Sequence, residues 1–101
     1  MSDLSRGAPA VSLLPESLDG RAVADFRAEL LSRRGADLDL DGSQVVRLGA
    51  GCLQQILAAA RSWSEDGRRL RVVRPSEALL SNLSTMGAVA AVPMLLEKAD
   101  A

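Results

Sequence analysis

An α/β fold is predicted by two features of the sequence, the alternation of strand-like with helix-like stretches and the residues that separate them. Short apolar runs alternate with longer stretches of helical spacing. Proline, glycine or a capping residue stands at most of the transitions. Alternation of this kind indicates a layered fold whose parallel strands are joined by right-handed crossovers. In such folds functional groups gather in the loops that lead from strands into helices.

The N-terminal part predicts a strand followed by a helix. Residues 10–15 form a short apolar run that Pro15 stops, which is typical of a strand. Helical spacing follows; Asp19 or Ser17 can cap its start, and Gly35 can end it. The apolar face of this helix is expected to hold Val23, Phe26, Leu30 and, at its margin, Leu31.

A second strand and a second helix are predicted in the middle of the chain. Residues 37–41 alternate in polarity, Gly42 and Ser43 form a polar turn, and a short apolar approach leads to a pair of glycines. From Ala50 the spacing becomes helical, and the helix is expected to end in the segment SEDG. Its apolar face consists of Leu53, Ile56, Leu57 and Ala60.

The C-terminal part predicts a third strand and a third helix. Arginines alternate with apolar residues over 68–75, which suits a strand with one face near solvent, and Pro75 stops it. Ser76 is placed to cap the next helix, and Gly87 to close it. The apolar residues of that helix are Leu79, Leu80, Leu83 and Met86.

The chain is expected to form a single domain. Residues 88–101 fit either a last helix or a strand broken at Pro93. We therefore predict a domain over residues 10–96, a flexible N-terminus over residues 1–9 and a C-terminal tail over residues 97–101.

Charge and hydropathy disfavour two kinds of partner. With 12 basic and 13 acidic residues the net charge is −1, whereas a nucleic-acid binder needs a basic face. No apolar stretch reaches the roughly 18 residues of a membrane-spanning helix, and the start of the chain lacks the apolar core of a signal peptide. We therefore expect a cytoplasmic protein that neither binds nucleic acid nor inserts into a membrane.

The absence of histidine removes most catalytic chemistry. Without histidine there is no Ser-His or Cys-His nucleophile pair and no common zinc site. Cys52 is the only cysteine, so neither an internal disulfide nor a cysteine metal cluster can form. The carboxylates lie on turns and helix faces, where solvated charge is the usual explanation. We expect no enzymatic activity, no cofactor and no bound metal.

The segment LGAG, residues 48–51, lies where the central apolar run becomes helical. A dinucleotide-binding fingerprint would continue to a third glycine, but that position holds Gln54. A P-loop would need a lysine followed by serine or threonine, which the segment lacks. Phosphate binding is therefore disfavoured. The glycines are expected to allow a sharp turn and a helix that starts close to the sheet.

Four elements in fixed order occupy the central half of the chain: LDLDGSQV, LGAG, CLQQILAAARSWSEDG and GRRLRVVRPS. Together they resemble a STAS domain, the fold of bacterial anti-sigma factor antagonists, over about residues 10–88. The resemblance implies a mixed, mainly parallel sheet of about four strands with three to four helices. It also implies a protein that works by binding other proteins. Many STAS domains begin with a hairpin, whereas the segment before Pro15 has room for one strand, which indicates a reduced sheet.

The LGAG turn departs from the D-S-S-G turn of that family. Gly49 stands where the family has a phosphorylatable serine, and Leu48 stands where it has an aspartate. The usual switch, in which a phosphate at the helix N-terminus expels a partner, is therefore not available at Gly49. Ser43 is a candidate substitute acceptor, although turn serines more often form local hydrogen bonds with the backbone.

The stretch LDGSQVVRLGAGCLQQILAAARSWSEDGRRL is similar to small stand-alone STAS proteins found beside chemotaxis genes in alphaproteobacteria. This resemblance implies a non-catalytic partner of the chemotaxis histidine kinase. The expected partner contacts are Ser43, Arg47, Gly49, Ala50, Gly51 and Gln54. Two alternatives stay open, an anti-sigma factor antagonist that binds a serine kinase and an accessory subunit of a transporter. The oligomeric state is left open as well.

Three further features each have two interpretations. Cys52 is either a thiol activated by the helix dipole or a small buried residue. Trp63 either covers the end of the apolar helix face or serves as an exposed docking aromatic. Four arginines form either a patch for an acidic partner or a solvated strand face. They are Arg68, Arg69, Arg71 and Arg74.

Overall fold

The computed structural model describes residues 10–87, so the predictions for residues 1–9 and 88–101 lie outside the described part of the chain. Within it, strands and helices alternate as the sequence predicts. The elements are β1 (Ala10–Leu13), β2 (Ser17–Leu18), the 3-10 helix η1 (Gly20–Ala22), α2 (Val23–Ser32), β3 (Leu38–Asp41), β4 (Arg47–Leu48), α3 (Ala50–Glu65), β5 (Leu70–Val73) and α4 (Glu77–Thr85).

The main sheet has three parallel strands in the order β1-β3-β5. Leu38 of the central strand lies opposite Ala10 on one side and Leu70 on the other. A second sheet pairs β2 with β4, again in parallel. The predicted α/β fold with a mainly parallel sheet is confirmed. The small second sheet was not predicted, because a strand of two residues is too short to show an alternation.

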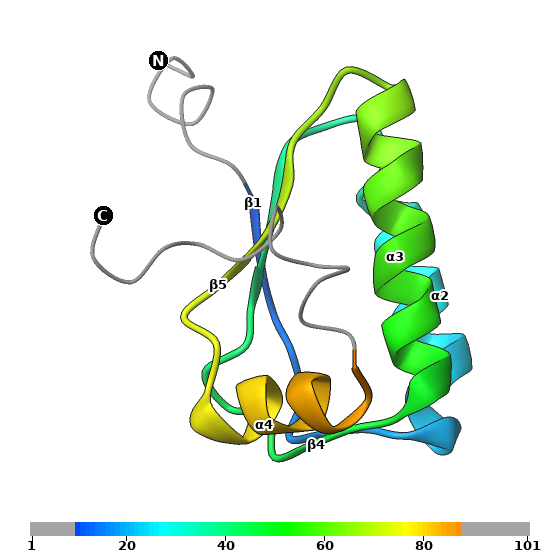
Figure 1. Cartoon of the computed structure of the whole chain (residues 1–101). Helices are drawn as coiled ribbons and strands as arrows, with labels where there is room; N and C mark the ends of the chain where they lie inside the picture. The colour runs from blue at the N-terminus through cyan, green and yellow to red at the C-terminus, as the bar shows by residue number, and fades with distance from the viewer. Residues whose placement is uncertain (1–9, 88–101) are drawn as a thin grey trace.

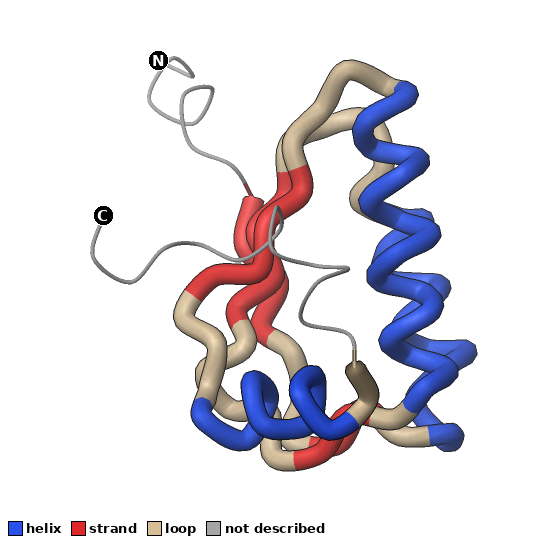
Figure 2. Tube along the Cα trace, in the orientation of Figure 1, coloured by secondary structure: helices blue, strands red, loops and turns tan. Residues whose placement is uncertain are grey.

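The elements form two layers with a helix across one end. Figure 1 shows α2 and α3 side by side on one face of the main sheet, with α4 lying crosswise beside β4. Figure 2 shows the β2-β4 sheet at the same end of the molecule as α4. This end also holds the start of α3, so three parts of the chain that are distant in sequence meet there, namely β2, β4 with the start of α3, and α4.

One hydrophobic core fills the space between the main sheet and the helices. Leu38 and Leu40 alternate into it from β3, and both are fully buried. Phe26 and Leu30 enter it from α2 as predicted. The other buried members of the core are Leu14, Leu18, Val45, Leu48, Cys52, Leu53, Ile56, Ala59, Trp63, Leu70, Val72, Leu79 and Leu83.

Two leucines expected on apolar helix faces are exposed instead. Leu31 is 58% exposed and Leu80 is 39% exposed. Each follows a buried leucine, Leu30 or Leu79, by one position. Because successive helical residues are about 100° apart around the axis, the second leucine of each pair points away from the core.

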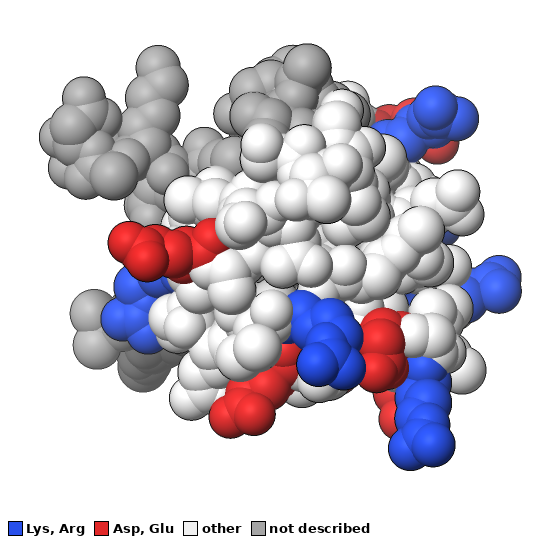
Figure 3. All heavy atoms as spheres, turned by 60° about the horizontal axis from the view of Figure 1, so that its bottom comes forward, with Lys and Arg blue, Asp and Glu red and all other residues white. Residues whose placement is uncertain are grey.

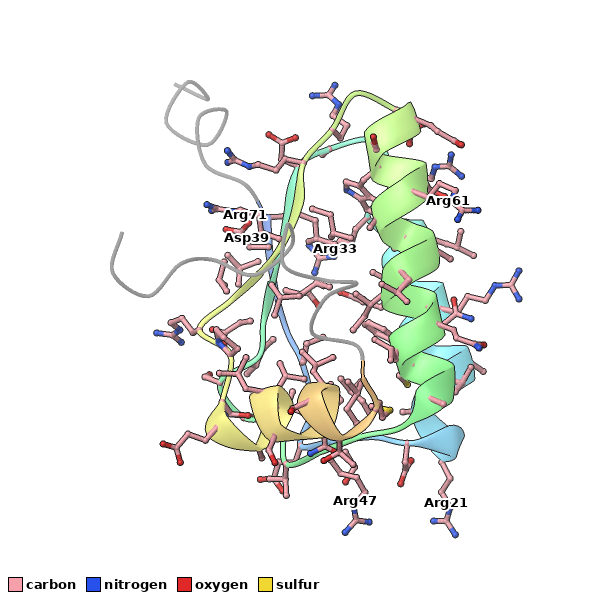
Figure 4. The ribbon with its side chains drawn as sticks, in the orientation of Figure 1. Arg21, Arg33, Asp39, Arg47, Arg61 and Arg71 are labelled. Carbon is pink, nitrogen blue, oxygen red and sulfur yellow. The ribbon has the colours of Figure 1, made fainter. Side chains whose placement is uncertain are left out.

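The other face of the main sheet carries charged pairs. Asp39 accepts hydrogen bonds from Arg71 Nε and Nη2 at 3.1 and 3.0 Å. Figure 4 shows the two residues beside each other. Asp41 accepts from Arg74 Nη2 at 2.7 Å. Both carboxylates belong to buried residues, so the expectation of solvated charge is wrong for them. Two of the four arginines considered above therefore form ion pairs with β3.

Candidate functional site

The turn between β4 and α3 brings a helix N-terminus to one end of the molecule. Gly49 is the N-cap, with φ −97° and ψ 168°, and it has no side chain to cap the helix. Its N–H donates to the Leu18 carbonyl at 2.7 Å, and its carbonyl accepts from the Leu53 N–H at 3.1 Å. Because α3 has 16 residues, the positive end of a full helix dipole lies at this turn.

Two neighbouring segments hold the turn in place. The Glu16 carbonyl, just before β2, accepts from the Val46 and Arg47 N–H groups at 2.7 and 3.0 Å. On the other side, Asn82 Oδ1 of α4 accepts from the Leu48 N–H at 3.2 Å. The start of α3 is therefore anchored by main-chain hydrogen bonds to the segment before α2 and by a side chain of α4.

Five of the six predicted contact residues belong to this turn and to the first turns of α3. Arg47, Ala50 and Gln54 are exposed, whereas Gly49 and Gly51 are half-buried. Residues 50 and 54 stand one helical turn apart on the same side of α3. The turn therefore presents a surface that a partner can reach without any rearrangement of the core.

One residue that sequence analysis did not predict joins this surface. Arg21 lies in η1, where its N–H donates to Asp19 Oδ1 at 3.2 Å. Figure 4 shows the side chains of Arg21 and Arg47 directed away from the molecule at the same end. Their position at the same end depends on the pairing of β2 with β4, for which the sequence has no periodic signal.

In the view of Figure 3, charges of both signs surround a largely uncharged area.

The two glycines of the turn have different surroundings. A Cβ atom at Gly51 would lie 2.8 Å from Val23 Cγ2, so this glycine lets α3 begin close to α2. A Cβ atom at Gly49 would meet nothing nearer than 3.5 Å, where it would touch Asp19 and Leu18. Gly51 therefore permits a close approach of α3 to the helix α2, whereas the sequence predicted an approach to the sheet. Gly49 lies beside Leu18 of β2, but the space there would accept a Cβ atom.

The sixth predicted residue, Ser43, lies in the turn after β3. It is exposed, and its N–H donates to Asp41 Oδ1 at 2.9 Å. Hydrogen bonding from Ser43, followed by that from Arg74, holds the pKa of the Asp41 carboxyl below its usual range. Arg74, whose side chain donates to this carboxylate, has a φ of 50°, in the left-handed region that non-glycine residues rarely adopt.

Gly42 makes this second turn compact. Its N–H donates to the Val73 carbonyl at 2.9 Å, and its carbonyl accepts from the Ser76 N–H at 3.0 Å. A Cβ atom at Gly42 would lie 2.7 Å from Leu79 Cδ2. The β3 turn is therefore packed directly against the start of α4.

The structure decides between the interpretations of Cys52 and Trp63. Cys52 is completely buried, and its Sγ lies 3.7 Å from the Asp19 carbonyl. Burial raises the pKa of the Cys52 thiol, and the nearby Asp19 charge raises it further, so the activated-thiol interpretation is wrong. Trp63 is also buried and donates from Nε1 to the Ala36 carbonyl at 2.8 Å. It covers the end of the core and is not an exposed docking aromatic.

The described residues contain no sign of a metal centre or a membrane span. No three His, Cys, Asp or Glu side chains among residues 10–87 form a group that could hold a metal ion. In the same range, no helix has both the length and the apolar character needed to cross a bilayer.

The chain has a mainly parallel sheet, two helices on one face of that sheet, and an anchored turn before the second helix. This arrangement defines a small α/β domain of the STAS type. A family model described as "Mlab, STAS domain" matches residues 3–97, and the chain therefore belongs to the STAS domain family. STAS domains are generally non-catalytic modules that bind proteins. A comparison with curated proteins gives no match.

Proposed function

We propose that this chain is a docking module that binds a chemotaxis histidine kinase, or a related signalling kinase, in the cytoplasm. The observation that carries the proposal is the exposed, anchored start of α3 with glycine at the position of the family's acceptor serine. Gly49 has no hydroxyl to phosphorylate. Binding at this turn is therefore controlled by the presence of the partner and not by a phosphate at the helix N-terminus.

The proposed docking surface consists of Arg21, Val46, Arg47, Ala50 and Gln54. Val46 is 59% exposed and supplies an apolar contact, while the other four are exposed residues of η1, β4 and α3. Two arginines and the positive end of the α3 dipole favour an acidic group on the partner. An apolar contact within a polar rim is the usual composition of a protein interface.

The decisive experiment compares partners and surface variants together. The chain is immobilised and offered a chemotaxis histidine kinase, an anti-sigma serine kinase and a transporter ATPase subunit. We expect the chemotaxis kinase to be retained, and we expect Arg47→Glu to weaken its binding at least about ten-fold, because a charge at the interface is reversed. Arg61→Glu, at an exposed position farther along α3, is the matched control and leaves binding unchanged.

Other outcomes of that experiment would replace the proposal. Retention of the serine kinase with phosphate incorporation at Ser43 would identify an anti-sigma factor antagonist. Retention of the ATPase subunit would identify an accessory transporter subunit. If folded Arg47→Glu and Gln54→Ala variants bind the chemotaxis kinase as well as the wild type does, the docking surface is assigned to the wrong face.

A further inference from the structure

The first strand of the main sheet, β1, has one edge that no other strand of the described residues covers. β3 pairs with one side of β1, and no strand within residues 10–87 pairs with the other. Natural proteins usually protect such an edge with a charged residue, a proline or a bulge. The β1 sequence AVSL contains neither charge nor proline. Its outward-facing side chains, Val11 and Leu13, are 56% and 55% exposed.

A groove of about 530 Å³ runs beside this edge, with β1 on one side and α2 on the other. Val11 and Leu13 contribute exposed apolar atoms to its lining, and the buried core residues Leu14, Leu18 and Phe26 also border it. The groove thus combines a row of unpaired main-chain groups with apolar surface. This combination accepts an added β-strand, in which main-chain hydrogen bonds supply affinity.

The α2 side of the groove carries an ordered row of charges. Asp25, Glu29 and Arg33 follow at four-residue intervals, so they form one stripe along the helix, and all three line the groove. Glu29 lies level with the middle of β1, because Ser12 Oγ donates to Glu29 Oε2 at 3.1 Å. Arg33 Nε lies 3.0 Å from the same oxygen. Asp25 is exposed and forms no ion pair with any residue of the described range.

We propose that this edge is a self-association surface on which a second copy of the chain places its own β1. The two β1 strands run antiparallel about a two-fold axis at Ser12. In this register Val11 of each copy lies opposite Leu13 of the other copy. The exposed apolar side chains of both strands therefore pack against each other. The two three-stranded sheets become one continuous sheet, and both β1 edges become paired.

Charge complementarity selects a second copy over an unrelated strand. Asp25 and Arg33 lie about 6 Å along the helix on either side of Glu29. Since Glu29 is level with the axis, the rotation that pairs the strands also reverses one α2 relative to the other. Asp25 then meets Arg33 of the second copy, and the same contact occurs again by symmetry. The Glu29 carboxylates near the axis are each compensated by a bound Arg33 and Ser12 within their own chain.

Sedimentation equilibrium of the full chain and of two charge variants tests the proposal. Wild type is expected to form a dimer at high concentration. Asp25→Arg places two arginines opposite each other at both contacts, and Arg33→Asp places two carboxylates there, so each variant alone should dimerise at least about ten-fold more weakly. An equimolar mixture of the two variants restores both complementary contacts. The mixture should therefore associate more strongly than either variant does alone.

The mixing experiment separates association from damage to the fold. A variant that merely unfolds cannot be rescued by another variant, and circular dichroism checks that both remain helical. Glu65→Arg and Arg61→Asp form a matched pair on α3, are exposed and lie outside the groove, so neither should change association. Val11→Lys should weaken it, since it puts a charge on the paired edge.

Three results would overturn the proposal. The first is a wild-type chain that stays monomeric at its solubility limit, with the β1 amides exposed to hydrogen exchange. The second is a monomer whose β1 amides are protected, which would mean that another segment of the same chain covers the edge. The third is a dimer that the charge variants do not weaken, which would place the interface elsewhere.

Discussion

The turn after β3 and the turn before α3 both contain glycine in a polar setting, yet only the first requires it. A Cβ atom at Gly42 would lie 2.7 Å from Leu79, whereas one at Gly49 would have only ordinary contacts of 3.5 Å or more. Both turns are fixed by main-chain hydrogen bonds. The difference shows that glycine at position 42 is imposed by packing, while glycine at position 49 changes the chemistry of a turn whose backbone would accept a side chain.

The largest effect is expected from Gly42→Ala. The added methyl group overlaps Leu79 Cδ2, and this buried side chain must shift against its neighbours in the core, so we expect a loss of about 1–3 kcal/mol in the free energy of unfolding. Urea denaturation followed by circular dichroism measures it. Gly20→Ala is the control, because no atom lies within 4 Å of the new methyl group there, and it should change stability by less than about 0.5 kcal/mol. Equal losses in both variants would contradict the steric explanation.

Asp41→Asn tests the charge that holds the same turn. The variant loses charge-assisted hydrogen bonds from Ser43 and Arg74, and we expect it to be about 1–2 kcal/mol less stable at pH 7. The pKa of Asp41 is lowered in the folded chain. Its contribution is therefore complete above the unfolded pKa, near pH 4, and is lost as the pH falls through the lower folded pKa.

The measurement is thermal unfolding of wild type and variant between neutral and acidic pH. The gap between the two melting temperatures should close on acidification, because wild type then loses the same charge that the variant lacks. A gap that stays constant across this range would mean that Asp41 stabilises the turn through shape alone. Glu77→Gln, at an exposed position in the first turn of α4, is a control for the loss of a surface carboxylate.

A smaller effect is expected from Gly51→Ala. Alanine favours the helix by about 1 kcal/mol, but its methyl group would lie 2.8 Å from Val23 Cγ2. We expect the two contributions to leave a net loss below about 1 kcal/mol. A double-mutant cycle with Val23→Ala checks the cause, because removing the Val23 methyl groups should turn the substitution into a stabilising one. If the cycle shows no coupling, the contact between α2 and α3 does not limit this position.

The smallest effect is expected from Gly49→Ser. The Gly49 backbone already has the extended conformation of an N-cap, and a serine hydroxyl can accept a hydrogen bond from the first turn of α3. We expect a gain of a few tenths of a kcal/mol, measured by urea denaturation against Gly49→Ala, which adds the carbon without the hydroxyl. A loss of stability in the serine variant would show that the turn excludes side chains after all.

The sequence predicted the elements that have a strong periodic or capping signal. Ser76 caps α4 as expected, with its Oγ accepting from the Leu79 N–H at 2.9 Å. β2 and β4 escaped prediction because their pairing joins two segments of two residues each. The burial of Asp39 and Asp41 escaped as well, since it depends on arginines more than 30 residues later in the chain.

The candidate site was predicted in position more than in detail. The start of α3 was found from the change of spacing at Ala50, and Arg47 and Gln54 are exposed there as expected. The sequence could not show that packing requires glycine at position 42 but not at position 49. The atom that excludes a side chain at Gly42 belongs to Leu79, far along the chain. Whether a glycine is required depends on tertiary neighbours, which a local pattern does not contain.

The extended backbone at Gly49 also bears on how such a domain changes over evolutionary time. Codons for glycine and serine can differ by a single base, and the Gly49 turn needs no repacking to accept the larger residue. A single substitution to serine would therefore place a hydroxyl at the start of α3 without a change in the packing around it. The fold has not closed over this position, so the chemistry of the turn can change while the fold stays the same.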